Sequence, residues 1–438
     1  MQPIEKVFEL DDGEAWTLDT LRTFIDRHRR LCVRYQELLD LYTGRHPILT
    51  KQAKADYKPD NRLVVNYARY IVDTFNGYFI GVPVRTVSDK ASVSDYIQFL
   101  ETYNALDDNN ADLAKKSSIY GHAYELLFID EEGQIGITNL SPMECFLVYD
   151  TSIRQHARYG VRYQVLKDNV IRGTYSDEEK IYYFVIDSDG VRIESEIEHY
   201  FGAVPLVEYV ENEERIGAFE FVETLIKSYD QAMSEKANDV DYFSDAYMKI
   251  LGADLDEQTL RSIRDHRIIN LSGADSEHIV VEFMEKPNAD TTQENLLNRL
   301  EKQIFAISMV ANINDDQFAT SSGIALKYKL QSMSNLANTK ERKFSKGFHQ
   351  RFDLIARSPA GKLQPEDLIS IDYVFTRNIP TNLTEEAQNA RALQGIVSDE
   401  TVLRTLSVVP DVKAEMARIE DESNSSVLHD VTEDREES

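Results

Sequence analysis

Residues 290–358 read DTTQENLLNRLEKQIFAISMVANINDDQFATSSGIALKYKLQSMSNLANTKERKFSKGFHQRFDLIARS, with two helical patterns around a polar turn. The first helix is predicted to start at the beginning of this segment, because Thr291 and Glu294 have capping-box spacing. Leu and Ile then recur on one helical face until a run of Asn and Asp ends the pattern. A second helix is predicted from about Ser322 to Arg357. Two helices and the turn between them therefore organise the C-terminal half of the chain.

The second helix is basic, although the chain has a formal net charge of -28. Residues 324–357 hold eight Lys or Arg but only two acids, Glu341 and Asp353. At about 1.5 Å per residue, this helix would be a rod of ~50 Å. Two interpretations remain open: a solvated face, or cations that pair with acids of the same chain or of a neighbouring copy.

Composition limits the class of protein. A chain of 438 residues is expected to form two to four domains, and 42% hydrophobic residues allow sizeable cores. The two cysteines, Cys32 and Cys145, and the absence of CxxC support neither a disulfide framework nor a zinc site, and indicate folding in the cytoplasm. We expect neither a signal peptide nor a membrane partner, since no apolar run approaches ~18 residues. The acidic balance argues against tight binding of nucleic acid, but not against a protein through which DNA passes.

The N-terminal half changes from a helical period to a period of two. Helices are predicted at 17–43, 63–79, 95–104 and 106–120. Strands are predicted at 124–129, 135–138, 145–149, 159–165, 181–186, 191–197 and 206–210. The sequence therefore predicts an α+β fold in which helices accompany an antiparallel sheet.

The remaining segments are predicted as a stalk, a tip and a helical end. A long helix at 214–248 is followed by a small insert, 253–289, after which the helix that starts at residue 290 returns. The insert is expected to hold a short helix at 257–265 and strands at 267–271 and 278–284. After the basic helix come a strand at 369–375, helices at 384–394, 398–406 and 410–420, and a tail that holds eight acids in its final 19 residues.

No known catalytic motif is present. The sequence lacks a P-loop, GxGxxG, HExxH and GxSxG. Glu178-Glu179-Lys180 could imitate an acidic nuclease element, but it is better explained as the turn before the strand at 181–186. We therefore predict no catalytic residue, no metal site and no cofactor.

Three segments carry a resemblance to a known family. They are KPDNRLVVNY at 58–67 with FNGYFIGVP at 75–83; Tyr229-Asp230 with Ser234, Ala237-Asn238 and Asp241; and FATSSGIALK at 318–327. Over about residues 20–415 the chain resembles the portal proteins of tailed bacteriophages, in the branch common among phages of Gram-positive hosts. This resemblance implies the portal fold.

The resemblance divides the chain into named parts. It implies a wing of helices and antiparallel sheet at 1–212, stem helices at 213–252 and 290–312, a small α/β clip at 253–289, a tunnel loop at 313–323, the long basic helix at 324–358, a wing strand region at 359–379, a helical crown at 380–419 and an acidic disordered tail at 420–438.

The resemblance also implies a function and partners. Portal subunits form a ring, usually a dodecamer, at one capsid vertex, and double-stranded DNA is packaged and ejected through it. The expected partners are further copies of the chain, DNA, the terminase large subunit, a head–tail adaptor, and the major capsid and scaffolding proteins. The expected location is the virion, after assembly in the host cytoplasm. A phage-encoded DNA-processing enzyme and a monomeric adaptor protein remain as alternatives.

Three sets of residues follow as site predictions. The tunnel loop in the DNA channel comprises Asn314, Asp315, Asp316, Gln317, Phe318, Ala319, Thr320, Ser321, Ser322 and Gly323. The candidates for subunit contact are Lys340, Arg342, Lys343 and Lys346. The candidates for partner binding at the clip are Glu257, Arg261, Arg264, His266 and Arg267. In a ring, repeated Asp315 and Asp316 would form a negative collar that repels the phosphates of DNA.

Overall fold

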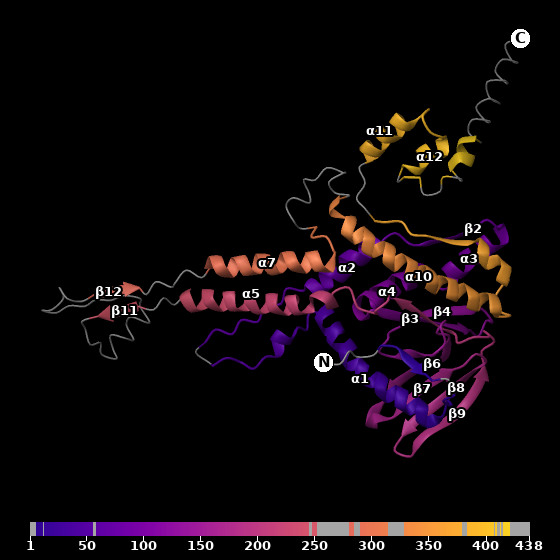
Figure 1. The fold of residues 1–438 in the computed structure, drawn as a ribbon, viewed down its shortest axis with the longest axis horizontal. Coiled ribbons are helices and arrows are strands. Elements are labelled where there is room, and N and C mark those ends of the chain that lie inside the picture. Colours follow the sequence, from indigo (N-terminus) through magenta and orange to yellow (C-terminus); the bar gives the residue numbers. More distant parts are fainter. Residues whose placement is uncertain are drawn as a thin grey trace, which may run out of the picture.

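The computed structural model describes residues 6–11, 13–55, 58–244, 248–251, 280–283, 290–313, 328–378, 383–406, 408–409, 412 and 415–420. Figure 1 shows an α/β body, a two-helix arm that projects from it, and a group of short helices beyond the body. We call these three parts the body, the arm and the C-terminal helices. The view is down the shortest axis of the molecule, so one side of the body faces the viewer and the opposite side lies behind it.

Four helices form much of the body: α1 (Leu18–Tyr42), α2 (Tyr67–Ile80), α3 (Ala91–Tyr103) and α4 (Leu106–Tyr120). Each lies close to its predicted range. The second helix starts at Tyr67 rather than at residue 63, because Asn66 caps it by accepting a hydrogen bond from the Arg69 amide at 2.9 Å. The residues just before this cap make hydrogen bonds to the arm instead.

The strands form two main sheets rather than one. The six-stranded sheet has the order β1-β5-β6-β7-β8-β9, the three-stranded sheet has the order β10-β3-β4, and β13 pairs with β2. The strands are β1 (Phe8–Leu10), β2 (Arg85–Ser88), β3 (His122–Ile129), β4 (Ile135–Leu140), β5 (Cys145–Asp150), β6 (Ala157–Val165), β7 (Ile171–Ser176), β8 (Lys180–Asp187), β9 (Gly190–Glu198), β10 (Leu206–Val210) and β13 (Ile371–Val374). The predicted strands pair in antiparallel fashion, and the one parallel pair in these sheets joins β5 to β1, a strand that was not predicted.

Four strands were not predicted from the sequence: β1, β2, β7 and, outside these sheets, Met248–Leu251 (β11). In β7, Gly173 interrupts the apolar pattern that would have indicated a strand. A Cβ atom at this glycine would lie 2.2 Å from the carbonyl oxygen of Arg162 on β6. The residue that weakens the strand signal is therefore the one that lets these two strands approach.

The arm consists of α5 (Glu223–Ser244) and α7 (Asp290–Ser308), which lie side by side, with β11 (Met248–Leu251) and β12 (Val280–Phe283) at the far end. The first helix was predicted to continue to Met248, which is wrong because β11 begins there. Phe305 contacts Tyr67 and Tyr70 of α2 at ring-centroid distances of 5.5 and 5.4 Å, so aromatic packing holds the base of the arm on the body.

The helix α10 (Gln331–Arg357) crosses the body from its junction with the arm (Figure 1). Its start was predicted near Ser322, which lies outside the described residues. Gly347 on its inner face lets Tyr209 of β10 approach, since a Cβ atom there would lie 2.5 Å from the ring. The C-terminal helices are α11 (Leu383–Leu393), α12 (Asp399–Arg404) and a helical segment at 415–420. Short 3-10 segments occur at Pro47–Thr50, Lys167–Asn169, Glu220–Val222 and Pro365–Ser370.

Candidate functional site

Lys340 lies on the inner face of α10 and is only 1% exposed. Its ammonium lies 2.7 Å from a carboxylate oxygen of Glu211 and donates hydrogen bonds to Ser118 Oγ at 2.8 Å and to the Ala114 carbonyl at 2.9 Å. Burial lowers the pKa of this ammonium, although Glu211 opposes the shift. The prediction that Lys340 contacts a neighbouring subunit is therefore wrong, because its donors are directed to groups within its own chain.

A second cation of α10 is buried three turns further along. The guanidinium of Arg351 is bidentate on Glu125 of β3, with Nη2–Oε1 at 2.6 Å and Nε–Oε2 at 2.8 Å. It also donates to Asn110 of α4 at 2.6 Å. The sequence analysis counted this arginine among the basic residues but did not assign it a role. The available signal was its position on the same helical face as Phe344 and Phe348, which are buried.

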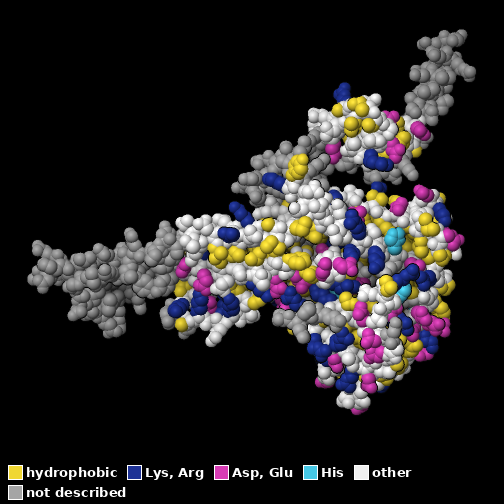
Figure 2. All heavy atoms as spheres, viewed as in Figure 1, with side chains coloured by type: hydrophobic (Ala, Val, Ile, Leu, Met, Phe, Trp, Pro, Cys, Tyr) yellow, Lys and Arg dark blue, Asp and Glu magenta, His cyan; other side chains and the backbone are white. Residues whose placement is uncertain are grey.

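The outward face of α10 carries the remaining candidates for subunit contact. Lys343 pairs with Glu213 of its own chain, as the second of the two interpretations allowed. Arg342 and Lys346 are exposed and line a shallow depression with Ser345, His349 and Gln350. Two acids also line it, Glu341 and Asp353, and each pairs with an arginine of the same chain, Arg377 and Arg357. Figure 2 shows Lys and Arg side chains over this part of the surface. We call the surface formed by Arg342, Lys346, His349 and Gln350 the basic face of α10; the prediction of subunit contact is still open for its first two residues.

The extended segment at residues 61–65, just before α2, runs along α5. Regularly spaced hydrogen bonds join the two, and we call this set of bonds the ladder. Three backbone amides donate to α5 side chains: Val65 to Asp230 at 2.9 Å, Leu63 to Ser234 at 2.9 Å, and Asn61 to Asn238 at 2.6 Å. The spacing is two residues on the extended segment and four on the helix. Two extended residues span about 6.6 Å and four helical residues about 6.0 Å, so the two periods match. Two of the segments that carried the family resemblance are therefore partners in one structure.

The ladder ends in a buried histidine. His46 Nδ1 lies 2.5 Å from Asp230 Oδ2, and its Nε2 lies 3.0 Å from the Leu41 carbonyl. Asp230, itself buried, is thus bonded through both carboxylate oxygens. We infer that the ladder fixes the angle between the arm and the body, because it joins α5 to the C-terminal end of α1 and the start of α2.

A third buried network lies between the two sheets. Glu208 of β10 accepts hydrogen bonds from Arg215 at 2.8 and 2.7 Å, from His122 Nδ1 at 2.6 Å and from the Tyr149 hydroxyl at 2.7 Å. Burial alone would raise the pKa of Glu208, but the bonds from Arg215 and His122 outweigh it and hold that pKa well below its usual range. Among the described residues, no group of three or more His, Cys, Asp or Glu is placed to hold a metal ion. These networks join elements of the fold.

The other predicted site residues fall outside the described part of the chain. These are the tunnel-loop residues Asn314 to Gly323 and the clip residues Glu257, Arg261, Arg264, His266 and Arg267. Their flanks are described. The amide of Ile313 donates to the Tyr70 hydroxyl at 2.8 Å, which places the point where the loop begins against α2, while β11 and β12 frame the other segment at the tip of the arm.

Comparison with known proteins identifies the family. A model of the family described as "Phage portal protein, SPP1 Gp6-like" matches residues 21–427. The chain belongs to this family of phage portal proteins. The portal protein of Bacillus phage SPP1 is 25% identical to it over 403 residues, 85% of this chain and 78% of that protein. The portal protein of Clostridium phage phiCD119 is 25% identical over 426 residues, 87% of this chain and 91% of that protein.

The family and the α+β portal fold predicted from the sequence are confirmed, and the function is that of a phage portal. Portal proteins are structural components of the virion capsid. Of the helices in the described part of this portal, none combines the length and the apolar character that a bilayer crossing requires.

Proposed function

We propose that copies of this chain form a closed ring, usually a dodecamer in this family, that conducts double-stranded DNA through one capsid vertex. The observation that supports association into a ring is the exposed apolar surface of the arm. Figure 2 shows hydrophobic side chains gathered along α7. Leu296 and Ile307 of α7 are 50% and 46% exposed. Val240 of α5 is 63% exposed, and Phe221, in the 3-10 segment before α5, is 57% exposed. A contiguous apolar surface of this kind is typical of an interface between proteins.

The parts of the portal are proposed to follow the family plan. The body at 1–212, with the strand region at 359–379, forms the wing, crossed by the long helix at 324–358. The two arm helices, within 213–252 and 290–312, form the stem, and 253–289 at its tip forms the clip. The segment 313–323 is the tunnel loop, 380–419 is the crown and 420–438 is an acidic tail. The antiparallel arm with a strand pair at its end supports this division.

Partners follow from these positions. The clip, through Glu257, Arg261, Arg264, His266 and Arg267, is proposed to bind the terminase large subunit and afterwards a head–tail adaptor. The wing is proposed to contact the major capsid and scaffolding proteins during assembly in the host cytoplasm.

The channel is proposed to be acidic at its narrowest point. Asp315 and Asp316 would repeat around the ring, in a chain that already carries a formal net charge of -28. Negative walls lower the affinity for phosphate, since DNA binds proteins chiefly through Lys and Arg. DNA would then pass through the ring without adhering to it.

A packaging assay tests this proposal. Phage deprived of their own portal gene are supplied with this chain or with Asp315→Lys/Asp316→Lys, and nuclease-protected DNA is measured. We expect protected DNA only when the chain is supplied, and about a tenfold loss with the lysine variant, because each added contact with a phosphate retards the DNA. The matched control is Asp168→Lys/Asp189→Lys, on exposed turns of the six-stranded sheet. Normal packaging without the chain would contradict the function, and normal packaging by rings of the loop variant would contradict the acidic channel.

A further inference from the structure

The back of the body carries a surface that is complementary to the basic face of α10. On α3, Phe99 and Tyr103 stack at a ring-centroid distance of 5.3 Å and are 38% and 43% exposed. The hydroxyl of Tyr103 donates to Asp130 at 2.6 Å, which places the ring beside the turn between β3 and β4. That turn presents Glu131 and Glu132, both exposed. We call Phe99, Tyr103, Glu131 and Glu132 the acidic aromatic patch.

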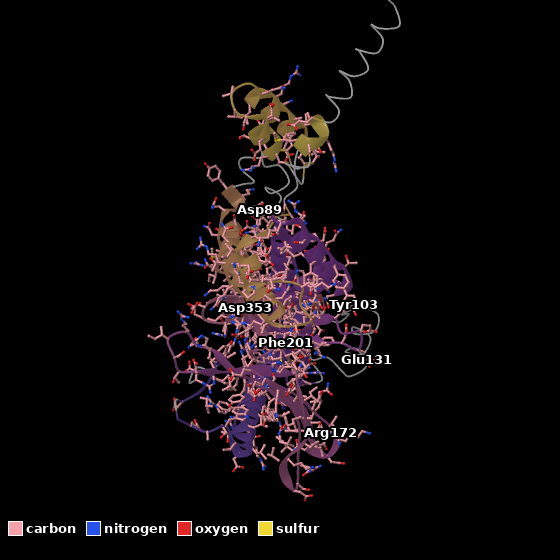
Figure 3. All side chains as sticks on the ribbon, turned by 90° about the vertical axis from the view of Figure 1, so that its right-hand side faces the viewer. Asp89, Tyr103, Glu131, Arg172, Phe201 and Asp353 are labelled. Carbon is pink, nitrogen blue, oxygen red and sulfur yellow. The ribbon has the colours of Figure 1, made fainter. Side chains whose placement is uncertain are left out.

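The patch and the basic face lie on opposite sides of the molecule. Figure 3 shows Tyr103 and Glu131 at one edge of the view and Asp353, which lines the depression of the basic face, towards the other edge. Tyr103 and Asp353 lie at a similar level of this view. A ring of identical subunits needs two different surfaces, one on each side, that meet at equal height and radius. These two surfaces meet the first condition.

The charged side chains on each surface are available for contact, whereas the Lys362 ammonium of the same chain already lies 5.6 Å from the centroid of the Phe99 ring. Within the described part of the chain, Arg342 and Lys346 form no ion pair, and neither do Glu131 and Glu132. Guanidinium groups stack well on aromatic rings and pair with carboxylates, so an arginine fits a surface that offers both. The basic face and the acidic aromatic patch therefore match in chemistry as well as in position.

We propose that the acidic aromatic patch binds the basic face of α10 on the next copy of this chain. Arg342 of one subunit stacks on the Tyr103 ring of its neighbour, and Lys346 pairs with Glu131 and Glu132. This inference rests on the proposed ring and specifies the contact between adjacent wings.

A mixing experiment tests the contact directly. The variant Arg342→Glu/Lys346→Glu has two acidic surfaces, and the variant Glu131→Lys/Glu132→Lys has two basic ones. Each variant alone should lose at least about tenfold of its ring fraction at low ionic strength, where like charges are least screened. Mixed in equal amounts they should form rings again, because opposite surfaces then alternate around the ring. The readout is light scattering after size-exclusion chromatography.

Controls keep the outcomes distinct. Lys167→Glu/Arg172→Glu reverses two charges on the six-stranded sheet and should leave the rings intact; Arg172 lies far from both surfaces in Figure 3. If circular dichroism shows that a reversal variant does not fold, the neutral pairs Arg342→Gln/Lys346→Gln and Glu131→Gln/Glu132→Gln replace it and should lower the ring fraction by about threefold.

Rings that survive every variant, or folded variants that do not recover on mixing, would overturn this contact alone. Absence of rings from the unaltered chain would instead overturn the proposed function.

Discussion

A buried lysine of α10 and an exposed lysine of a surface turn differ in what a single substitution should do. Lys340 is buried against Glu211, so Lys340→Met leaves a carboxylate without its counter-ion in a site that excludes water. We expect a loss of about 3–5 kcal/mol in the free energy of unfolding in urea. The control Lys167→Met removes an exposed ammonium from a surface turn and should change this free energy by less than about 0.5 kcal/mol.

The double variant Lys340→Met/Glu211→Gln separates the ion pair from simple packing. With both charges removed, no buried carboxylate is left unpaired, and we expect a large part of the lost stability to return. A double variant as unstable as Lys340→Met would show that the loss comes from packing rather than from the unpaired charge.

His28 of α1 should make stability depend on pH. Its Nε2 donates to the Pro142 carbonyl at 2.8 Å, so its Nδ1 accepts from the Tyr163 hydroxyl at 2.8 Å and the ring is neutral. Burial lowers the pKa of His28 to about 4, against 6.5 for the free side chain. Above pH 6.5 both the folded and the unfolded states are neutral at this residue. As pH falls from 6.5 to 4 the unfolded state alone gains the proton, so up to about 3 kcal/mol of stability is lost.

The comparison variant for this effect is His28→Gln, which keeps a donor and an acceptor but does not titrate. Unfolding in urea measured from pH 7.5 to 4 should show a shallower loss of stability for the variant than for the unaltered chain. Parallel curves would contradict the assignment of this slope to His28.

At the scale of elements, each hydrogen bond between α5 and the extended segment should be removable without loss of the others. Ser234→Ala removes the acceptor for the Leu63 amide, so hydrogen exchange at that amide should accelerate by about tenfold. Ser228→Ala is the matched control, because this serine lies on the same helix and is exposed. Equal exchange at Leu63 in both variants would show that the ladder does not hold the segment.

Elements with a clear period were predictable from the sequence, and those defined by distant partners were not. The range of α4 was predicted correctly because a regular pattern ends at Gly121. The three-residue strand β1 was missed because its pairing depends on β5, about 140 residues away in the chain. Lys340 was placed at the surface because a run of positive charge usually is solvated. Its burial depends on Glu211, whose position beside α10 only the tertiary structure shows.

At the scale of the whole molecule, the features that define a portal lie on surfaces that one chain leaves open. The arm exposes an apolar side, and the body carries a basic face in front and an acidic aromatic patch behind. In a monomer the apolar side of the arm is exposed to water and the two charged surfaces have nothing to bind. Each of these surfaces can contact a neighbouring subunit once copies are arranged around an axis. The sequence identified the family through local signatures, whereas the pairing of these surfaces required the three-dimensional arrangement.

The central claim is that copies of this chain close into a ring, and electron microscopy of the purified protein at low ionic strength tests it most directly. We expect annular particles with an open centre, in which the arms of all subunits point to one side. Particles that are monomers, or two-fold dimers without a central opening, would contradict it.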